Sequence, residues 1–370
     1  MHTYSPNIIL TSQVGFSTFA NNYVSAVGAT SAYGGAMCMS QGLLRDYNPV
    51  GPHSSSAKIL NTNFNNNFAT VKDFSDTEAV TAGGAVLIGH FMVLDQRGVI
   101  FQTVNFEGNS AYYGGDGGAV AMFGLKTAAT FVSTTFKKNV AWSRVADISY
   151  GGAMFVSKGA KVWLQDACEF FDNYAGTQDA SAFPDAFPGR GGALTVLSGL
   201  LSCVGCRFER NIASNTVSDG VSKGGAVYVG PIEDGFSQSK PTSRPRTSIK
   251  ERSQNAGKGP WQETQTFTNC IFLHNSVQST KSGSGKGGAL ATYLFSVEIV
   301  GCLFVNNTAE TSSLIPALGG AISLDTTSEG SKTPPLIRDC IFDFNMVCLS
   351  VLQIHVGLCI YSMYINLPIV

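Results

Sequence analysis

The sequence predicts an all-β protein, a right-handed single-stranded parallel β-helix of about eight to nine coils. Two short motifs alternate along almost the whole chain of 370 residues. Apolar residues recur at every second position after one of these motifs, which is typical of a strand with one buried face. No segment has helical periodicity long enough for a crossover helix, and short strands repeated without helices favour a solenoid.

The first motif is Phe-x-x-Asn. Phenylalanine is expected to end an inward-facing strand and to form an aromatic column, because like residues of successive coils stack about 4.8 Å apart. Asparagine is expected in the following turn, where it tolerates left-handed backbone angles and bonds to backbone groups of its own and the adjacent coil. The copies are Phe19/Asn22, Phe64/Asn67, Phe106/Asn109, Phe136/Asn139, Phe170/Asn173, Phe208/Asn211, Phe272/Asn275, Phe304/Asn307 and Phe342/Asn345. The asparagines, with the phenylalanines from Phe64 onward, form the predicted structural ladder.

The second motif is Gly-Gly-Ala followed by an aliphatic residue. Its copies begin at Gly34, Gly83, Gly117, Gly151, Gly191, Gly224, Gly287 and Gly319. The glycines are expected to supply a positive φ or a close backbone approach where the chain turns into the next strand. Apolar residues at alternate positions then face the core, as Val86 and Ile88 illustrate. Architecture thus accounts for both motifs, and no catalytic residue is predicted.

Residues 1–345 are expected to form the β-helix domain. A polar segment at 230–262, rich in lysine and arginine, has no periodic apolar residues and predicts a disordered basic loop that leaves the solenoid. A smaller insertion at 177–190 carries Phe183 and Phe187 beside two prolines. It is expected either to contact a partner or to fold back over its coil.

The apolar segment 346–370 contains no Lys, Arg, Asp or Glu. Its length suits a membrane span, although Gln353, His355 and Asn366 interrupt it and no basic flank follows. The alternatives are a buried terminal strand pair and a non-native tail. The N-terminus shows no signal-peptide pattern, and the chain is expected to be a piece of a larger protein or a monomer.

The spacing Cys203-x-x-Cys206 is found in zinc and redox sites. Such a site needs further cysteine or histidine partners in register, and strand alternation would place these two side chains on opposite faces. Five cysteines instead stand two residues before a motif phenylalanine and should form an inward column of small core residues. They are Cys168, Cys206, Cys270, Cys302 and Cys340. No metal site and no cofactor are predicted.

The enzymatic alternative is a polysaccharide lyase or glycoside hydrolase on the same scaffold. Such enzymes need paired carboxylates or basic residues clustered on one exposed face. The closest group, Asp166, Glu169 and Asp172, is interpreted as a solvated strand edge. The other carboxylates considered, at Asp116, Asp147 and Asp325, do not recur at equivalent positions of neighbouring coils.

Only 13% of the residues are charged and the formal net charge is −1, so no field would attract nucleic acid. Asn306-Asn307-Thr308 is an N-glycosylation sequon whose acceptor is Asn306.

The alternation of the two motifs resembles the repeat of polymorphic outer membrane proteins over roughly residues 15–345. The resemblance implies a right-handed parallel β-helix of the pectin-lyase-like type and a protein active in adhesion. It implies an extracellular or cell-surface location, at an outer membrane or plasma membrane. The expected partner is an unidentified surface ligand, protein or carbohydrate, with membrane association through 346–370 as an additional candidate. The function expected is therefore non-enzymatic, in adhesion, ligand binding or rigid spacing.

Overall fold

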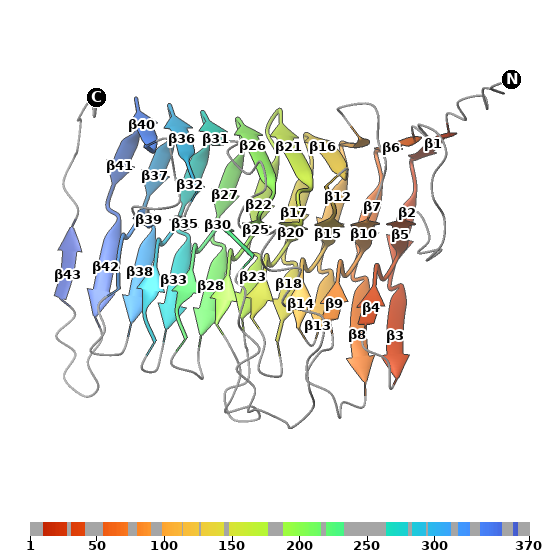
Figure 1. Ribbon diagram of the computed structural model, residues 1–370, viewed down its shortest axis with the longest axis horizontal. Coiled ribbons are helices and arrows are strands. Elements are labelled where there is room, and N and C mark those ends of the chain that lie inside the picture. Colours follow the sequence, from red (N-terminus) through yellow and green to blue (C-terminus); the bar gives the residue numbers. More distant parts are fainter. Residues whose placement is uncertain are drawn as a thin grey trace, which may run out of the picture.

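The computed structural model describes sixteen segments of the chain. They are residues 10–27, 31–40, 55–72, 80–89, 98–112, 114–125, 127–143, 148–176, 188–215, 220–232, 264–279, 283–293, 295–311, 317–325, 334–349 and 358–361. Within these segments every regular element is a β-strand, and the strands form five sheets, here named A to E. Successive coils advance along one axis from the N-terminal to the C-terminal end (Figure 1).

Among the described residues, each of the first seven coils contributes one short strand to sheets A, B, C, D and E in that order, whereas the eighth lacks a strand in sheet D and the ninth has strands in sheets A, B and C only. Sheet A contains β1 (Leu10–Gly15), β6 (Ser55–Leu60), β11 (Val99–Gln102), β16 (Ala128–Val132), β21 (Lys161–Gln165), β26 (Leu200–Val204), β31 (Gln265–Thr268), β36 (Val297–Val300) and β40 (Leu336–Arg338). Sheet B contains β2 (Thr18–Ala20), β7 (Asn63–Asn65), β12 (Asn105–Glu107), β17 (Thr135–Lys137), β22 (Glu169–Phe171), β27 (Arg207–Glu209), β32 (Ile271–Leu273), β37 (Leu303–Val305) and β41 (Ile341–Asp343).

The remaining strands complete the coil. Sheet C contains β3 (Tyr23–Val27), β8 (Phe68–Lys72), β13 (Ser110–Tyr112), β18 (Val140–Trp142), β23 (Tyr174–Gly176), β28 (Ile212–Asn215), β33 (Ser276–Ser279), β38 (Thr308–Thr311), β42 (Met346–Leu349) and β43 (Leu358–Tyr361). Sheet D contains β4 (Ser31–Tyr33), β9 (Val80–Ala82), β14 (Gly115–Asp116), β19 (Ser149–Tyr150), β24 (Gly189–Arg190), β29 (Ser222–Lys223) and β34 (Gly285–Lys286). Sheet E contains β5 (Met37–Ser40), β10 (Val86–Gly89), β15 (Val120–Phe123), β20 (Met154–Ser157), β25 (Leu194–Leu197), β30 (Val227–Gly230), β35 (Leu290–Tyr293) and β39 (Ile322–Asp325).

The strands of each sheet pair in parallel with the equivalent strands of neighbouring coils. Motif residues therefore align one above another, as Phe106 does with Phe64 and Phe136. This arrangement confirms the predicted parallel β-helix, with nine coils in sheets A and B. The exception is β43, which runs antiparallel to β42 at the C-terminal end of sheet C.

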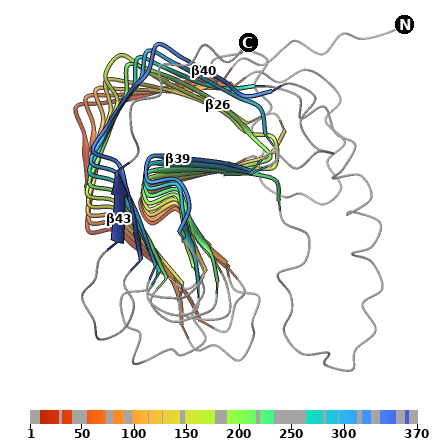
Figure 2. The same ribbon diagram turned by 90° about the vertical axis from the view of Figure 1, so that its left-hand side faces the viewer.

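The main core lies between sheets A, B and E. Viewed along the stack, sheets A and E face each other across this core, whereas sheets C and D run close together away from it (Figure 2). The alternating residues after Gly-Gly-Ala belong to the core as predicted, with Val86, Ile88, Leu194 and Val196 all at 0% exposure. The layer between sheets C and D is thin because small side chains fill it, mostly alanines such as Ala141 of β18.

Candidate functional site

The motif phenylalanines form one continuous column inside sheet B. Neighbouring rings lie with their centroids 4.6 to 5.0 Å apart and their planes within 10° of parallel, from Phe19 to Phe342. Such close spacing follows from the parallel register, since each ring stacks on the ring of the next coil. The seven rings from Phe64 to Phe304 are fully buried.

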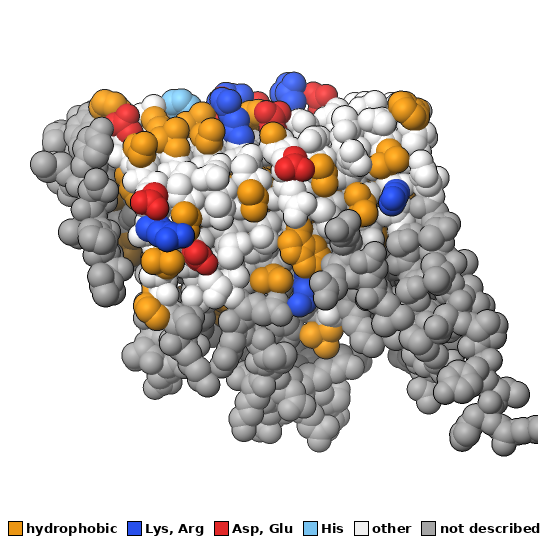
Figure 3. Space-filling model, turned by 90° about the horizontal axis from the view of Figure 1, so that it is seen from above, with side chains coloured by type: hydrophobic (Ala, Val, Ile, Leu, Met, Phe, Trp, Pro, Cys, Tyr) orange, Lys and Arg blue, Asp and Glu red, His pale blue; other side chains and the backbone are white. Residues whose placement is uncertain are grey.

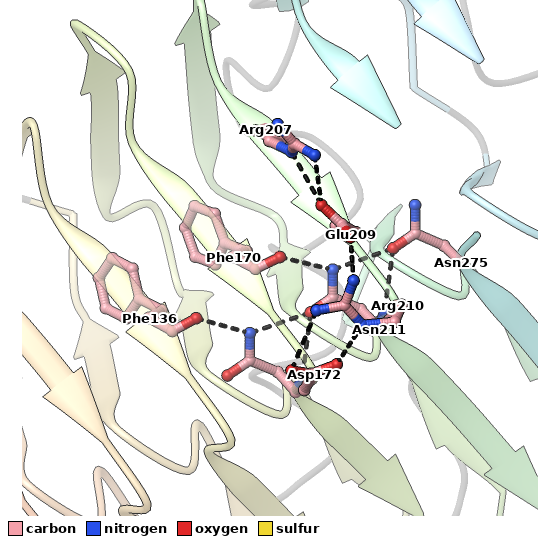
Figure 4. A network of polar contacts seen from close by, with 9 residues as sticks. Phe136, Phe170, Asp172, Arg207, Glu209, Arg210, Asn211 and Asn275 are labelled. Atoms are coloured by element: carbon pink, nitrogen blue, oxygen red, sulfur yellow. Dashed lines mark hydrogen bonds and ion pairs between the residues drawn. The ribbon is translucent and has the colours of Figure 1, made fainter. Parts of the chain in front are cut away.

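The asparagines form a continuous hydrogen-bonded ladder beside this column. Asn211 is representative: its Nδ2 donates to the Phe170 carbonyl oxygen at 2.9 Å and to Asn275 Oδ1 at 2.9 Å. Its Oδ1 accepts from the backbone N–H of Asn173 at 3.1 Å and from Asn173 Nδ2 at 2.9 Å. Both polar atoms of the amide are therefore satisfied in a buried position (Figure 4). The same contacts run from Asn22 to Asn345.

The left-handed residue of this turn is not the ladder asparagine but the residue before it, which corrects the expectation from the sequence. The preceding residue turns the corner between sheets B and C, and the ladder asparagine then faces the interior. These preceding residues have φ values from 48° to 66° in every coil: Asn21, Asn66, Gly108, Lys138, Asp172, Arg210, His274, Asn306 and Phe344. Asn306, the sequon acceptor, is thus a partly exposed corner residue.

Asn67, Asn109 and Asn139 illustrate this correction in three successive coils. The sequence places them in a turn with left-handed backbone angles, yet none of the three has a positive φ, and each is at 0% exposure. Their position is explained by their hydrogen bonds, because Asn67 Nδ2 donates to Asn109 Oδ1 and Asn109 Nδ2 donates to Asn139 Oδ1. An inward amide can bond to the amides of both adjacent coils, whereas a side chain at the exposed corner would point away from them.

The two glycines of Gly-Gly-Ala have different tasks at the corner between sheets D and E. The first has a positive φ in all eight copies, as at Gly191 with 62°. The second approaches the next coil so closely that a Cβ on Gly192 would lie 2.1 Å from the Gly225 carbonyl oxygen. Both tasks that the sequence predicts for glycine are present, one at each position.

An ion-pair network covers the ladder on the outer surface of sheet B. Arg210 donates from Nε to Asp172 Oδ1 at 2.7 Å and also pairs with Glu209, which in turn accepts from Arg207 Nη2 at 2.6 Å (Figure 4). The hydrogen bond to Asp172 raises the pKa of the Arg210 guanidinium. Asp172, assigned from the sequence to a solvated edge, is therefore held by a cation of the next coil. Two carboxylates and two guanidinium groups gather here on one outer face.

A second charged row lies on the outer surface of sheet D. The residue directly before each Gly-Gly-Ala stacks in register there, so that Tyr150, Arg190, Lys223 and Lys286 follow one another in successive coils. Their side chains lie against a cluster of aromatic residues of sheet E that includes Phe155, Tyr228 and Tyr293. We call the charged row and this cluster together the basic–aromatic corner.

Cation–π contacts connect the cations and the aromatic rings of the basic–aromatic corner. The Arg190 guanidinium lies 5.2 Å from the ring centroid of Tyr228. The Lys223 ammonium lies 5.3 Å from that of Tyr228 and 4.9 Å from that of Tyr293. Lys286 pairs with Asp325 at 3.7 Å. Arg190 and Tyr228 are buried, whereas Lys223, Lys286 and Tyr293 are partly exposed.

The sequence interpretation does not single out the basic–aromatic corner, although a signal is present. Its cations stand at one fixed place, immediately before Gly-Gly-Ala, in three consecutive copies of the motif. Comparing the repeats column by column would have revealed them. The aromatic partners Tyr228 and Tyr293 could not have been matched to these cations, because the match depends on how sheets D and E meet.

The cysteine column is present in the core, but Cys203 lies where strand alternation does not place it. Alternation predicts Cys203 and Cys206 on opposite faces, whereas both point inward, with 0% and 1% exposure. The reason is Gly205, whose φ of 65° turns the chain between β26 and β27 and cancels the alternation. The Sγ atoms of Cys203, Cys206 and Cys270 all lie within 4.8 Å of one another.

The remaining candidate carboxylates are scattered. Asp116 lies in sheet D, Asp166 lies in the corner between sheets A and B, and Glu169 lies on the outer face of β22. Asp147 falls outside the described residues. Seen from the side of sheet A, the described surface carries few charged side chains among many neutral ones (Figure 3).

The predicted insertions fall mostly outside the described residues, which omit 177–187 and 233–263. Of the apolar segment 346–370, the structure describes the antiparallel pair β42 and β43. Among the described residues, no helix is both long and apolar enough to cross a membrane.

Comparisons with known proteins do not place this chain in a family, so its class is given by its architecture alone. No family model, no curated protein and no solved structure matches this chain. The protein is thus defined by its fold as a parallel β-helix with an asparagine ladder.

Proposed function

We propose that the protein is a non-enzymatic, extracellular or cell-surface β-helix that binds an acidic carbohydrate through the basic–aromatic corner. The resemblance of its repeats to polymorphic outer membrane proteins supports the surface location and the role in adhesion. The interior motifs serve the scaffold, so ligand binding depends on the outward rows.

The observation that carries the proposal is the register of the partly exposed Lys223 and Lys286, which follow the buried Arg190 in the same row. These cations lie on three successive coils and are therefore spaced by about 4.8 Å per coil, close to the length of one sugar unit. Regularly spaced cations suit a polymer with a repeating anionic group. Partly exposed rings such as Tyr293 offer flat apolar faces on which sugar rings pack.

Lys158 is a further cation beside an aromatic ring of sheet E, with its ammonium 5.7 Å from the ring centroid of Phe123. Two carboxylates reduce the charge: Asp325 pairs with Lys286, and Asp116 precedes Tyr150 in the same row. The corner therefore combines an excess of positive charge with aromatic surface, which favours a carboxylated or sulfated polysaccharide over a neutral one.

The test is binding of the purified chain to immobilised polygalacturonate and to heparin, with neutral dextran as the reference surface. Replacing both Lys223 and Lys286 by glutamine should weaken binding roughly tenfold, because each partly exposed charge contributes about 0.5–1 kcal/mol. The control replaces Lys58 and Lys161, two lysines on the outer face of sheet A, in the same way. Equal binding by the two double variants would overturn the proposal.

The ion-pair network around Asp172 and Glu209 supports a second candidate, a polysaccharide lyase or hydrolase. It brings two carboxylates and two guanidinium groups onto one outer face, which is the kind of cluster such chemistry needs. We expect no new reducing ends and no unsaturated products from a panel of acidic polysaccharides. Turnover that is lost in both Asp172→Asn and Glu209→Gln would favour the enzyme.

A further inference from the structure

Cys203 breaks the pattern of the row to which it belongs. Its place on the inner face of sheet A is taken in the neighbouring coils by large apolar residues: Ile59, Phe101, Phe131, Leu164, Phe267 and Ile299. A cysteine fills less volume than any of these side chains, so close packing of the core does not explain it. Phe131, Phe267 and Ile299 of this row also contact cysteines of the column, through their carbonyl oxygens. Cys203 differs from them because its side chain adds a third sulfur beside two sulfurs of that column.

Three sulfur atoms meet at this point. Cys203 Sγ lies 3.5 Å from Cys270 Sγ, and Cys206 Sγ lies within 4.8 Å of both. With metal–sulfur bonds of about 2.3 Å, the sulfurs of a trigonal three-thiolate site lie about 4 Å apart. The three side chains therefore need only small shifts of their sulfurs to surround one ion.

The chemistry of the three ligands selects the ion. The group contains sulfur alone, all three side chains are at most 1% exposed, and the surrounding core is apolar. Soft thiolates select Cu(I), Zn²⁺ and iron–sulfur clusters. Because Zn²⁺ in structural sites is almost always four-coordinate, a set of three thiolates favours Cu(I). We propose that Cys203, Cys206 and Cys270 form a buried three-sulfur site for Cu(I).

Proton release accompanies binding, and no electron is transferred. Each cysteine that binds as a thiolate gives its proton to solvent. Because the sulfurs are buried in the folded chain, the ion enters while the coils assemble.

The position of the trio gives the ion a structural task. The longest separation between neighbouring ladder residues is the 64 positions from Asn211 to Asn275. Cys203 and Cys206 lie before this segment of the chain, and Cys270 lies near its end. Other neighbouring ladder residues are separated by 30 to 45 positions. A metal bond between the two coils would oppose their separation where the connecting chain is longest.

The experiment refolds the full chain under argon with excess reductant and Cu(I) supplied as its acetonitrile complex. After desalting, copper is measured by mass spectrometry, and the Cu–S shell by X-ray absorption. We expect about one copper per chain bound by three sulfurs. Cys203→Val should lose this copper, whereas Cys168→Val, a buried cysteine of the same column outside the trio, should retain it.

Circular dichroism establishes that each variant has folded, so that loss of copper is not loss of structure. Copper retention by Cys203→Val, or copper loss by Cys168→Val, would overturn the assignment of the three ligands. If the refolded wild-type protein contained no copper, the site itself would be overturned. The same conclusion would follow if the Cu–S shell were the same in Cys203→Val as in the wild type.

Discussion

Replacing Asn211 by alanine tests the asparagine ladder most directly. The substitution removes four hydrogen bonds, two donated by Nδ2 and two accepted by Oδ1. At about 1 kcal/mol of net stability for each bond, the loss is about 4 kcal/mol. It also leaves the Phe170 carbonyl and the Asn173 N–H buried without these partners, which raises the expected loss toward about 6 kcal/mol.

The loss should be local, because each coil of a solenoid contacts only its neighbours. Hydrogen exchange measured by mass spectrometry should show faster exchange in β22, β27 and β32 than in the distant strand β7. Urea unfolding followed by circular dichroism gives the accompanying change in stability, although a repeat array need not unfold in a single step.

Asn63→Ala is the matched control, since Asn63 is an exposed asparagine on the outer face of sheet B. Its effect should stay within about 0.5 kcal/mol. If Asn211→Ala were no more destabilising than this control, the ladder would not stabilise the fold, and the reasoning from buried amide hydrogen bonds would be refuted.

Three further predictions concern stability. Gly192→Ala should prevent normal coil stacking, because the added Cβ would overlap a backbone oxygen, and circular dichroism should show loss of folded protein. The control Gly89→Ala should fold normally, because its Cβ would meet nothing within 4 Å. Phe208→Ala should lower the unfolding free energy by about 3–5 kcal/mol in urea, and an effect below about 1 kcal/mol would contradict the stacked column. Burial raises the pKa of Tyr174 to about 12. The neutral phenol therefore contributes fully to the stability of the fold below about pH 10, and this contribution is lost as the pH rises through 12. Tyr174→Phe should therefore lose less stability than wild type across that interval, and parallel alkaline unfolding curves would contradict this.

The repeat determines most of the scaffold. Each residue of Phe-x-x-Asn and Gly-Gly-Ala suits one place in a stacked coil, so the alternation of the two motifs suffices to predict stacked coils, an inward aromatic column and glycine corners. The alternation after Gly-Gly-Ala likewise indicates which residues, such as Val86 and Ile88, enter the core. Local rules are enough here because each of these features is set within one short strand or turn.

Features that depend on the corners were decided by the tertiary structure. The turn at Gly205 brings Cys203 and Cys206 to the same side, which strand alternation alone could not predict. Parallel stacking places Arg210 beside Asp172, although 38 residues separate them in the chain. The angle between sheets D and E sets the cations before Gly-Gly-Ala against Tyr228 and Tyr293. The sequence by itself thus determined the structure of the single coil. The contacts between coils and across corners were decided only by the tertiary structure, because they join residues that are far apart in the chain and are not related by the repeat of a single strand.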